Sequence, residues 1–160
     1  MSLRLKNSLI EGHPVPKIPF VDVATGSLGQ GLSVAAGMAY SSKYMDKIDN
    51  RIWCICGDGE VAEGSVWEAA AFSSYYKLDN LVCIVDINRL GQSGETMLGH
   101  DDKAYEKRFS AFGWKTIVID GHDIAKIISA FKGAKVTDKN ERPVAILART
   151  CKGKYFGDKI

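Results

Sequence analysis

The sequence predicts an α/β fold in which helices cover both faces of a parallel sheet. Three observations lead to this prediction. Four short apolar runs alternate with helical patterns, glycine-rich or polar segments follow the first two runs, and 160 residues suffice for one domain with its own core. A hydrophobic content of 46% and a charged content of 25% favour a soluble globular domain.

Each apolar run is expected to form a strand and each periodic segment a helix. The expected strands are Ile52 to Cys56, Leu81 to Ile87, Lys115 to Asp120 and Val144 to Arg149. The expected helices are Gly29 to Asp46, Ser65 to Tyr76, Asp102 to Phe112 and Ile124 to Lys135. The first helix carries many small residues, which suit close packing on another backbone and favour a subunit contact.

Charge and cysteine content narrow the class of protein. A net charge of +2 without a dense basic cluster predicts no nucleic-acid partner. The first eleven residues lack a continuous apolar core, so neither a secretory signal nor a membrane span is expected, and a cytoplasmic location is predicted. Cys54, Cys56 and Cys83 lie in expected strands and Cys151 follows another, which predicts reduced thiols and no Cys54–Cys56 disulfide.

Polar side chains and glycines follow the first two expected strands. In an open parallel sheet the carboxyl ends of neighbouring strands form the usual ligand crevice. Asp58 offers a carboxylate oxygen, Asn88 an amide oxygen and Leu90 a backbone carbonyl, and Mg²⁺ prefers such ligands together with phosphate oxygens. Gly57 and Gly59 suit such a site, because glycine tolerates positive φ and lets the backbone approach a ligand closely. The pattern therefore predicts a metal–diphosphate site.

This arrangement resembles the thiamine-diphosphate signature, GDG followed about thirty residues later by asparagine. The surrounding motifs are similar to those of animal-type transketolase, and the resemblance runs from about Gly12 to Lys154. The motifs are Gly12–Pro16, Ala24–Gly31, Gly57–Glu60, Glu63–Ala69 and Asp86–Ser93. One departure is that Ile87 replaces the first of the paired asparagines that are often present, whereas the liganding Asn88 is retained.

The resemblance implies roles for further residues. Gly26, Ser27 and Leu28 would border the aminopyrimidine of the cofactor. The remaining cofactor contacts would be Gly59 at the diphosphate, Asn88 at the metal that binds it, Gln92 near the thiazolium ring and Lys152 near the phosphate. The structural alternative is that the strand-end residues only cap turns and that Lys152 is an exposed lysine after a strand.

Catalytic roles are also implied for one histidine and two acids. His13 lies in a rigid Gly-His-Pro turn and would line the substrate channel as a proton donor or acceptor. Glu63 and Glu68 would lie at a dimer interface in a proton network between two active sites, and otherwise they form a solvated helix start. His100 and His122 lack such a context, so His100 is expected to be an ordinary surface histidine and His122 a turn residue.

The implied activity is the transfer of a two-carbon ketol unit from a ketose phosphate to an aldose phosphate in the pentose phosphate pathway. Thiamine diphosphate and Mg²⁺ are the implied cofactors, with Ca²⁺ or Mn²⁺ as substitutes. Residues 1–11 are expected to be a partly flexible extension, residues 12–154 a truncated diphosphate-side domain and residues 155–160 a tail. Because the pyrimidine-side domain is not in this sequence, the isolated chain is expected to be inactive.

Two alternatives remain open. One is a noncatalytic transketolase-like protein that pairs with a full-length subunit instead of forming a homodimer. The other is a different thiamine-diphosphate enzyme, such as a 2-oxo acid dehydrogenase component or a deoxyxylulose phosphate synthase, which the segments Val66–Ala69 and Asn88–Gln92 disfavour. The spacing of glycines in Gly26–Gly31 does not match a nicotinamide-dinucleotide fingerprint.

Overall fold

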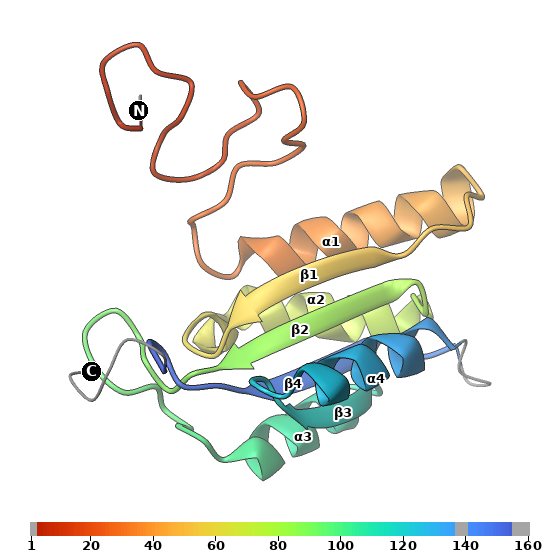
Figure 1. Ribbon diagram of the computed structural model, residues 1–160. Helices are drawn as coiled ribbons and strands as arrows, with labels where there is room; N and C mark the ends of the chain where they lie inside the picture. The colour runs from red at the N-terminus through yellow and green to blue at the C-terminus, as the bar shows by residue number, and fades with distance from the viewer. Residues whose placement is uncertain (1–2, 137–140, 155–160) are drawn as a thin grey trace.

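The computed structural model describes residues 3–136 and 141–154 (Figure 1). Its sheet consists of β1 (Ile52–Gly57), β2 (Leu81–Ile87), β3 (Lys115–Asp120) and β4 (Val144–Arg149). All neighbouring strands are parallel, and their order is β1-β2-β4-β3. The predicted parallel sheet is confirmed. Because β2 is central, its carboxyl end lies between those of β1 and β4.

The helices lie where the sequence periodicity predicts them. They are α1 (Gln30–Tyr40), α2 (Gly64–Tyr75), α3 (Asp102–Ala111) and α4 (Ile124–Lys135), with the single-turn 3₁₀ segment η2 (Glu60–Ala62) before α2. The first predicted helix, Gly29 to Asp46, is divided: Gly29 is the N-cap of α1, and Ser41–Met45 forms the π-helical segment η1.

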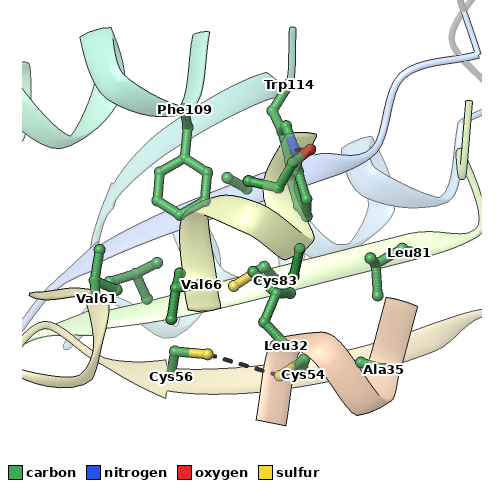
Figure 2. Close-up of a cluster of buried hydrophobic side chains, with 14 of the residues drawn as sticks. Leu32, Ala35, Cys54, Cys56, Val61, Val66, Leu81, Cys83, Phe109 and Trp114 are labelled. Atoms are coloured by element: carbon green, nitrogen blue, oxygen red, sulfur yellow. Dashed lines mark hydrogen bonds between the residues drawn. The ribbon is translucent and has the colours of Figure 1, made fainter. Parts of the chain in front are cut away.

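Helices cover both faces of the sheet, as expected, but unequally. The larger core contains residues of α1, α2 and α3 packed on β1, β2 and β4 (Figure 2). Among its fully buried large side chains are Leu32, Phe109 and Trp114, and the Trp114 indole N–H donates to the Ala70 carbonyl at 2.9 Å. A smaller core lies under α4, around Val82 and Ile146. The first three helices therefore contribute to one shared core with the sheet.

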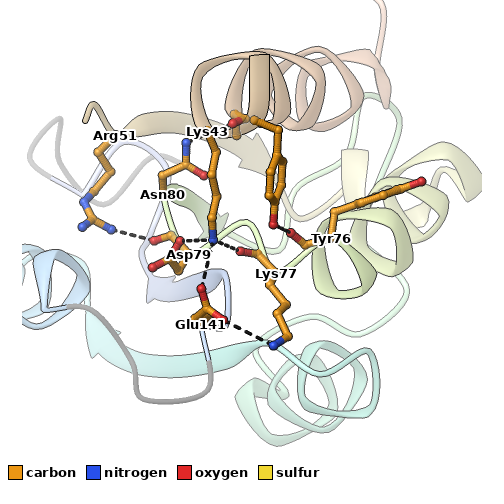
Figure 3. Close-up of polar contacts among 9 residues, drawn as sticks. Lys43, Arg51, Tyr76, Lys77, Asp79, Asn80 and Glu141 are labelled. Carbon is orange, nitrogen blue, oxygen red and sulfur yellow. Dashed lines mark hydrogen bonds and ion pairs between the residues drawn. The ribbon is translucent and has the colours of Figure 1, made fainter. Parts of the chain in front are cut away.

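Polar contacts tie the opposite, amino-terminal edge of the sheet together (Figure 3). The Lys43 ammonium lies 2.8 Å from the Asp79 carboxylate and 3.5 Å from the Glu141 carboxylate. Arg51 donates to the Asp79 carbonyl at 2.8 Å. Burial opposes the charge on Lys43, but the hydrogen bond and charge of Asp79 outweigh it and raise the pKa of Lys43. This cluster joins η1 to the segments that precede β2 and β4, at the edge of the sheet opposite to Asp58.

Within the described ranges every cysteine is free, as predicted. Cys54 and Cys56 point to the same side of β1, where the two sulfurs are 3.7 Å apart (Figure 2). The hydrogen bond with Cys56 and burial raise the pKa of the Cys54 thiol, so it stays protonated. No helix in the described part of the chain is long and apolar enough to cross a bilayer.

Candidate functional site

The carboxyl edge of the sheet brings together the polar residues that follow β1 and β2. Parallel pairing places Gly57 opposite Asp86. The Asp58 N–H donates to the Asp86 carbonyl at 3.1 Å, so pairing continues one residue past β1. Asp58 and Asn88 therefore start from adjacent backbone positions, as the sequence predicts for a shared site.

Asp58 is a buried carboxylate whose oxygens are both engaged. Only 4% of the residue is exposed. Its Oδ2 accepts hydrogen bonds from the Arg89 N–H at 2.8 Å and from the Thr96 hydroxyl at 2.7 Å, and its Oδ1 accepts one from the Gly59 N–H at 3.1 Å. Arg89 adopts the left-handed conformation, with φ of 60°, which aims its N–H at Asp58. Because Oδ2 has two donors and Oδ1 has one, Oδ1 is the oxygen with more capacity for a cation.

Hydrogen bonds hold both the nitrogen and the oxygen of the Asn88 side-chain amide. Its Nδ2 donates to Asp86 Oδ2 at 2.9 Å, and its Oδ1 accepts from the Leu90 N–H at 2.9 Å. The Thr150 hydroxyl donates to the other oxygen of Asp86. The Asn88 amide oxygen is thereby turned toward Leu90, the residue whose carbonyl is expected to be the third protein ligand.

The predicted donor set fits a hard cation that is shared with a phosphate. Asp58, Asn88 and Leu90 supply one carboxylate, one amide and one carbonyl oxygen, and Mg²⁺ is commonly held by one or two carboxylates plus substrate phosphates. In the described ranges no three His, Cys, Asp or Glu side chains are placed to hold a metal ion by themselves. A cation here would therefore depend on ligands from a diphosphate.

The two glycines beside Asp58 do not use the positive φ that glycine tolerates. Gly59 has φ of −65° and ψ of −36°, which any residue adopts, and Gly57 is likewise outside the left-handed region. Close approach of a ligand to the backbone therefore does not depend on positive φ at either glycine. A Cβ built at Gly57 would meet no atom within 4 Å, and one at Gly59 would make only ordinary contacts of 3.6 Å. Open space beside the backbone, instead of conformation, is what these glycines provide.

The segment around Gly26, Ser27 and Leu28 lines a hollow of about 130 Å³. Gly26, with φ of 112°, and Gly29, with φ of 84°, are the positions in this segment that require glycine. The Gly29 N–H donates to Glu60 at 2.9 Å, and its carbonyl accepts from the Ser65 hydroxyl at 2.9 Å. These bonds fix the glycine-rich turn beside the start of α2.

The three predicted catalytic residues lie at different distances from the strand ends. His13 is exposed and its ring lies against Gly26, because a Cβ at Gly26 would come within 2.8 Å of the imidazole. Glu63 is exposed at the N-cap of α2, beside Gly29. Glu68 is exposed on α2 and lines a separate apolar hollow. The structure therefore groups His13 and Glu63 with the glycine-rich turn, and places Glu68 on the helical face.

The remaining predicted residues are exposed. Gln92 lies in the loop that the short Leu90–Glu95 bridge closes, and Lys152 lies in the turn after β4. Both other histidines have backbone partners: His100 Nε2 pairs with the Thr150 carbonyl at 2.9 Å, and the Cys151 N–H donates to His122 Nε2 at 2.8 Å.

Four residues of the site were not assigned roles from the sequence. Glu60 accepts hydrogen bonds from Gly29 and, at 3.3 Å, from the Gly57 N–H, so it links the glycine-rich turn to β1. Thr96, Asp86 and Thr150 contact the two expected side-chain ligands directly or through one another. Glu60 and Asp86 lie inside the quoted motifs, whereas nothing local marks Thr96 or Thr150, which are brought in from distant positions.

Comparison with known proteins identifies the family. A family profile described as "Transketolase, thiamine diphosphate binding domain" matches residues 1–158. The chain is 57% identical over 155 residues to transketolase-like protein 2 of Mus musculus, covering 96% of this chain and 24% of that protein. It is 56% identical over 154 residues to transketolase of Homo sapiens, with the same coverage. The crystal structure of transketolase from Campylobacter jejuni is similar with a TM-score of 0.82 and 36% identity, covering 93% of this chain and 24% of that one.

The parallel sheet and its matched profile define a thiamine-diphosphate-binding domain of the α/β class. More narrowly, the chain belongs to the transketolase family. It spans about a quarter of the length of the curated relatives that it matches, 24% in both cases. The resemblance inferred from the sequence motifs is confirmed.

Proposed function

We propose that this chain provides the diphosphate-side half-site of a transketolase that transfers a two-carbon ketol unit from a ketose phosphate to an aldose phosphate. The observation that carries the proposal is the convergence of two strand ends, where the Arg89 N–H, one residue after Asn88, donates to buried Asp58 at 2.8 Å. Membership of the family supports the same reaction. We place this activity in the cytoplasm, in the pentose phosphate pathway.

Asp58, Asn88 and the Leu90 carbonyl would hold Mg²⁺, or Ca²⁺ or Mn²⁺ in its place. The cation would bind with the diphosphate, because one carboxylate alone is a weak site for a divalent ion. Gly57 and Gly59 would leave room for the phosphate oxygens, as the open space at Gly57 indicates. Thiamine diphosphate, when bound, supplies the carbon nucleophile and the electron sink of the reaction.

The other predicted residues would orient the cofactor and the substrate. Gly26, Ser27 and Leu28 would border the aminopyrimidine, since they line a hollow next to the site. Gln92 would approach the thiazolium ring and Lys152 the phosphate.

Proton handling falls to His13, Glu63 and Glu68. His13, exposed against Gly26, would exchange a proton with a sugar hydroxyl. Glu63 and Glu68 would join the two active sites of a dimer, because Glu63 is exposed at the N-cap of α2 and Glu68 is exposed on the helix.

Calorimetric titration with thiamine diphosphate tests the half-site. We expect binding by the chain in the presence of Mg²⁺ and none after chelation with EDTA. Asp58→Ala should abolish the metal-dependent signal, whereas Asp120→Asn, at the end of β3, should leave it unchanged. Equal binding by wild type and Asp58→Ala would refute the metal site.

Two assays separate the active-enzyme proposal from the noncatalytic alternative. The isolated chain should give no ketol transfer from xylulose 5-phosphate to ribose 5-phosphate, since half of each site is expected from a pyrimidine-side domain. Turnover equal to that of a complete transketolase would contradict this division of the site. A longer chain of the same gene that contains the other domain should be active, and its inactivity would favour the noncatalytic interaction protein.

Association is expected through the α1–α2 face. An apolar hollow of about 310 Å³ lies there, lined by Ser33, Ala36, Gly37, Glu68, Ala69 and Phe72. Trp67, on the same helix as Glu68, is half-buried and packs on Phe109 and Phe112, so it does not belong to this surface. A homodimer, or a pair with a full-length transketolase subunit, would cover the hollow. Light scattering at high concentration should show a dimer or larger species, and a stable monomer would refute this surface.

A further inference from the structure

Asp86 is a strand-end carboxylate that the proposed cofactor site does not use as a ligand. Both of its oxygens accept hydrogen bonds from uncharged groups: Oδ2 from the Asn88 Nδ2 at 2.9 Å and Oδ1 from the Thr150 hydroxyl. No ion pair to Asp86 occurs among the contacts resolved for the described residues. Its side chain therefore works as a double acceptor between the ends of β2 and β4.

The side-chain amide of asparagine has an oxygen, which accepts hydrogen bonds, and an NH₂ group, which donates them, and only the oxygen can bind a cation. A rotation of about 180° would exchange the oxygen for the NH₂ group and would remove the ligand. A carboxylate at 2.9 Å accepts a hydrogen bond from the NH₂ group but repels the amide oxygen, so Asp86 selects one of the two orientations. The Leu90 N–H selects the same one from the other side, by donating to Asn88 Oδ1 at 2.9 Å.

Thr150 orients the Asp86 carboxylate, because hydrogen bonds hold both the N–H and the carbonyl of Thr150. The Thr150 N–H donates to the Ile87 carbonyl at 3.0 Å, and the Thr150 carbonyl pairs with His100 at 2.9 Å. Its hydroxyl is thereby placed at the Asp86 carboxylate from a residue 64 positions away in the sequence. The contacts form one continuous path from His100 through Thr150 and Asp86 to Asn88.

We propose that Asp86 and Thr150 are positioning residues that lock the Asn88 amide with its oxygen toward the cation. This inference rests on the proposed metal–diphosphate site, since it assigns how one of its ligands is oriented. Residues that orient a metal ligand in this way typically change metal affinity by about 10- to 100-fold when they are replaced. Neither residue would contact the cation or the substrate.

The orientation can be measured in the metal-free chain by nuclear magnetic resonance. The Asn88 side-chain amide is identified as the NH₂ signal that Asn88→Ala removes. Its hydrogen-bonded proton should exchange slowly with water in the wild type and about 10-fold faster in Asp86→Ala, as expected when a bond worth roughly 1.4 kcal/mol is lost. The Asn80 amide, which donates to the Ala39 carbonyl at 3.0 Å, serves as the internal control and should not change. Unchanged exchange at Asn88 would overturn the proposal.

An exchange of the two side chains tests the link to the metal. The readout is free Mn²⁺, measured by electron paramagnetic resonance, in the presence of thiamine diphosphate. Asn88→Asp alone should weaken binding by about 10- to 100-fold, because it places a second carboxylate against Asp86. The double variant Asp86→Asn/Asn88→Asp should recover at least 10-fold of that loss, because Asn at 86 can again donate to Asp at 88 and accept from Thr150.

Thr150→Val should weaken Mn²⁺ binding in the same direction, and the matched variant Asp120→Asn should not. Asp120 also ends a strand and accepts a hydrogen bond two residues on, from the His122 N–H at 2.9 Å. No recovery in the double variant would overturn the positioning role. Failure of the wild type to bind Mn²⁺ with thiamine diphosphate would instead refute the proposed cofactor site, and the exchange rate of the Asn88 amide would still decide whether Asp86 holds it.

Discussion

Replacing Thr96 with valine removes the hydroxyl that supports Asp58 while keeping the shape of the side chain. The hydroxyl donates to Asp58 Oδ2 at 2.7 Å. The Thr96 backbone should stay in place, because its N–H donates to the Arg89 carbonyl at 2.9 Å. A hydrogen bond to a charged group contributes about 1.5–3 kcal/mol. Asp58 keeps two backbone donors, so we expect the lower half of this range, a loss of roughly 1.5–2 kcal/mol in the free energy of unfolding.

Urea unfolding followed by tryptophan fluorescence measures this loss, with the slope m unchanged if the variant keeps the native fold. Thr116→Val is the matched control, because its hydroxyl makes only an exposed contact of 3.5 Å with Glu106, and its effect should stay within about 0.5 kcal/mol. Mn²⁺ binding with thiamine diphosphate should weaken about 10-fold in Thr96→Val. Equal stabilities of the two valine variants would refute the argument that the hydroxyl supports a buried carboxylate.

Gly59→Ala should leave the free energy of unfolding within about 1 kcal/mol of wild type, because Gly59 has φ of −65° and an added Cβ would make only contacts of 3.6 Å. The same variant should block cofactor binding measured by calorimetry. Unchanged binding would argue against a phosphate beside Gly59. Lys43→Met should destabilise the fold by about 1–3 kcal/mol in urea unfolding, because it removes the ion pair with Asp79. Since the pKa of Lys43 is raised in the folded state, this loss of stability should be complete below pH 10.5 and should shrink as the pH rises through the folded-state pKa. A loss that grows with pH would contradict the prediction. A thiol reagent at about pH 8 should label the exposed Cys151 in the native protein. It should not label Cys54 or Cys56, because both are buried and their thiol pKa values are raised. Labelling of either residue in folded protein would contradict the prediction.

Much of the fold follows from local sequence patterns. The apolar runs that form β2, β3 and β4 have the predicted boundaries. For the central strands β2 and β4 the reason is that buried parallel strands are continuous hydrophobic segments bounded by polar turns. Glycine and small residues marked the start of α1, but no local pattern predicted that the π-helical segment η1 would follow it. The motif positions Asp58 and Asn88 were predictable for the same reason, since each directly follows a strand.

Other features depend on tertiary structure. The order β1-β2-β4-β3 places β4 beside β2, and only this pairing brings the Thr150 hydroxyl to Asp86. The Thr96 hydroxyl reaches Asp58 from 38 residues away. The backbone conformation of Gly57 and Gly59 was also decided by the tertiary structure, which shows no positive φ at either residue and open space beside Gly57.

The sequence by itself determined the chemistry available at the strand ends, namely one carboxylate, one amide and the glycines beside them. It did so because strand boundaries and motif spacing are local properties of the chain. Only the tertiary structure decided which oxygen of Asp58 has capacity left and which way the Asn88 amide faces. The physical reason is that donors from distant segments, such as Thr96 and Thr150, set those orientations, and their distances exist only after the sheet has formed.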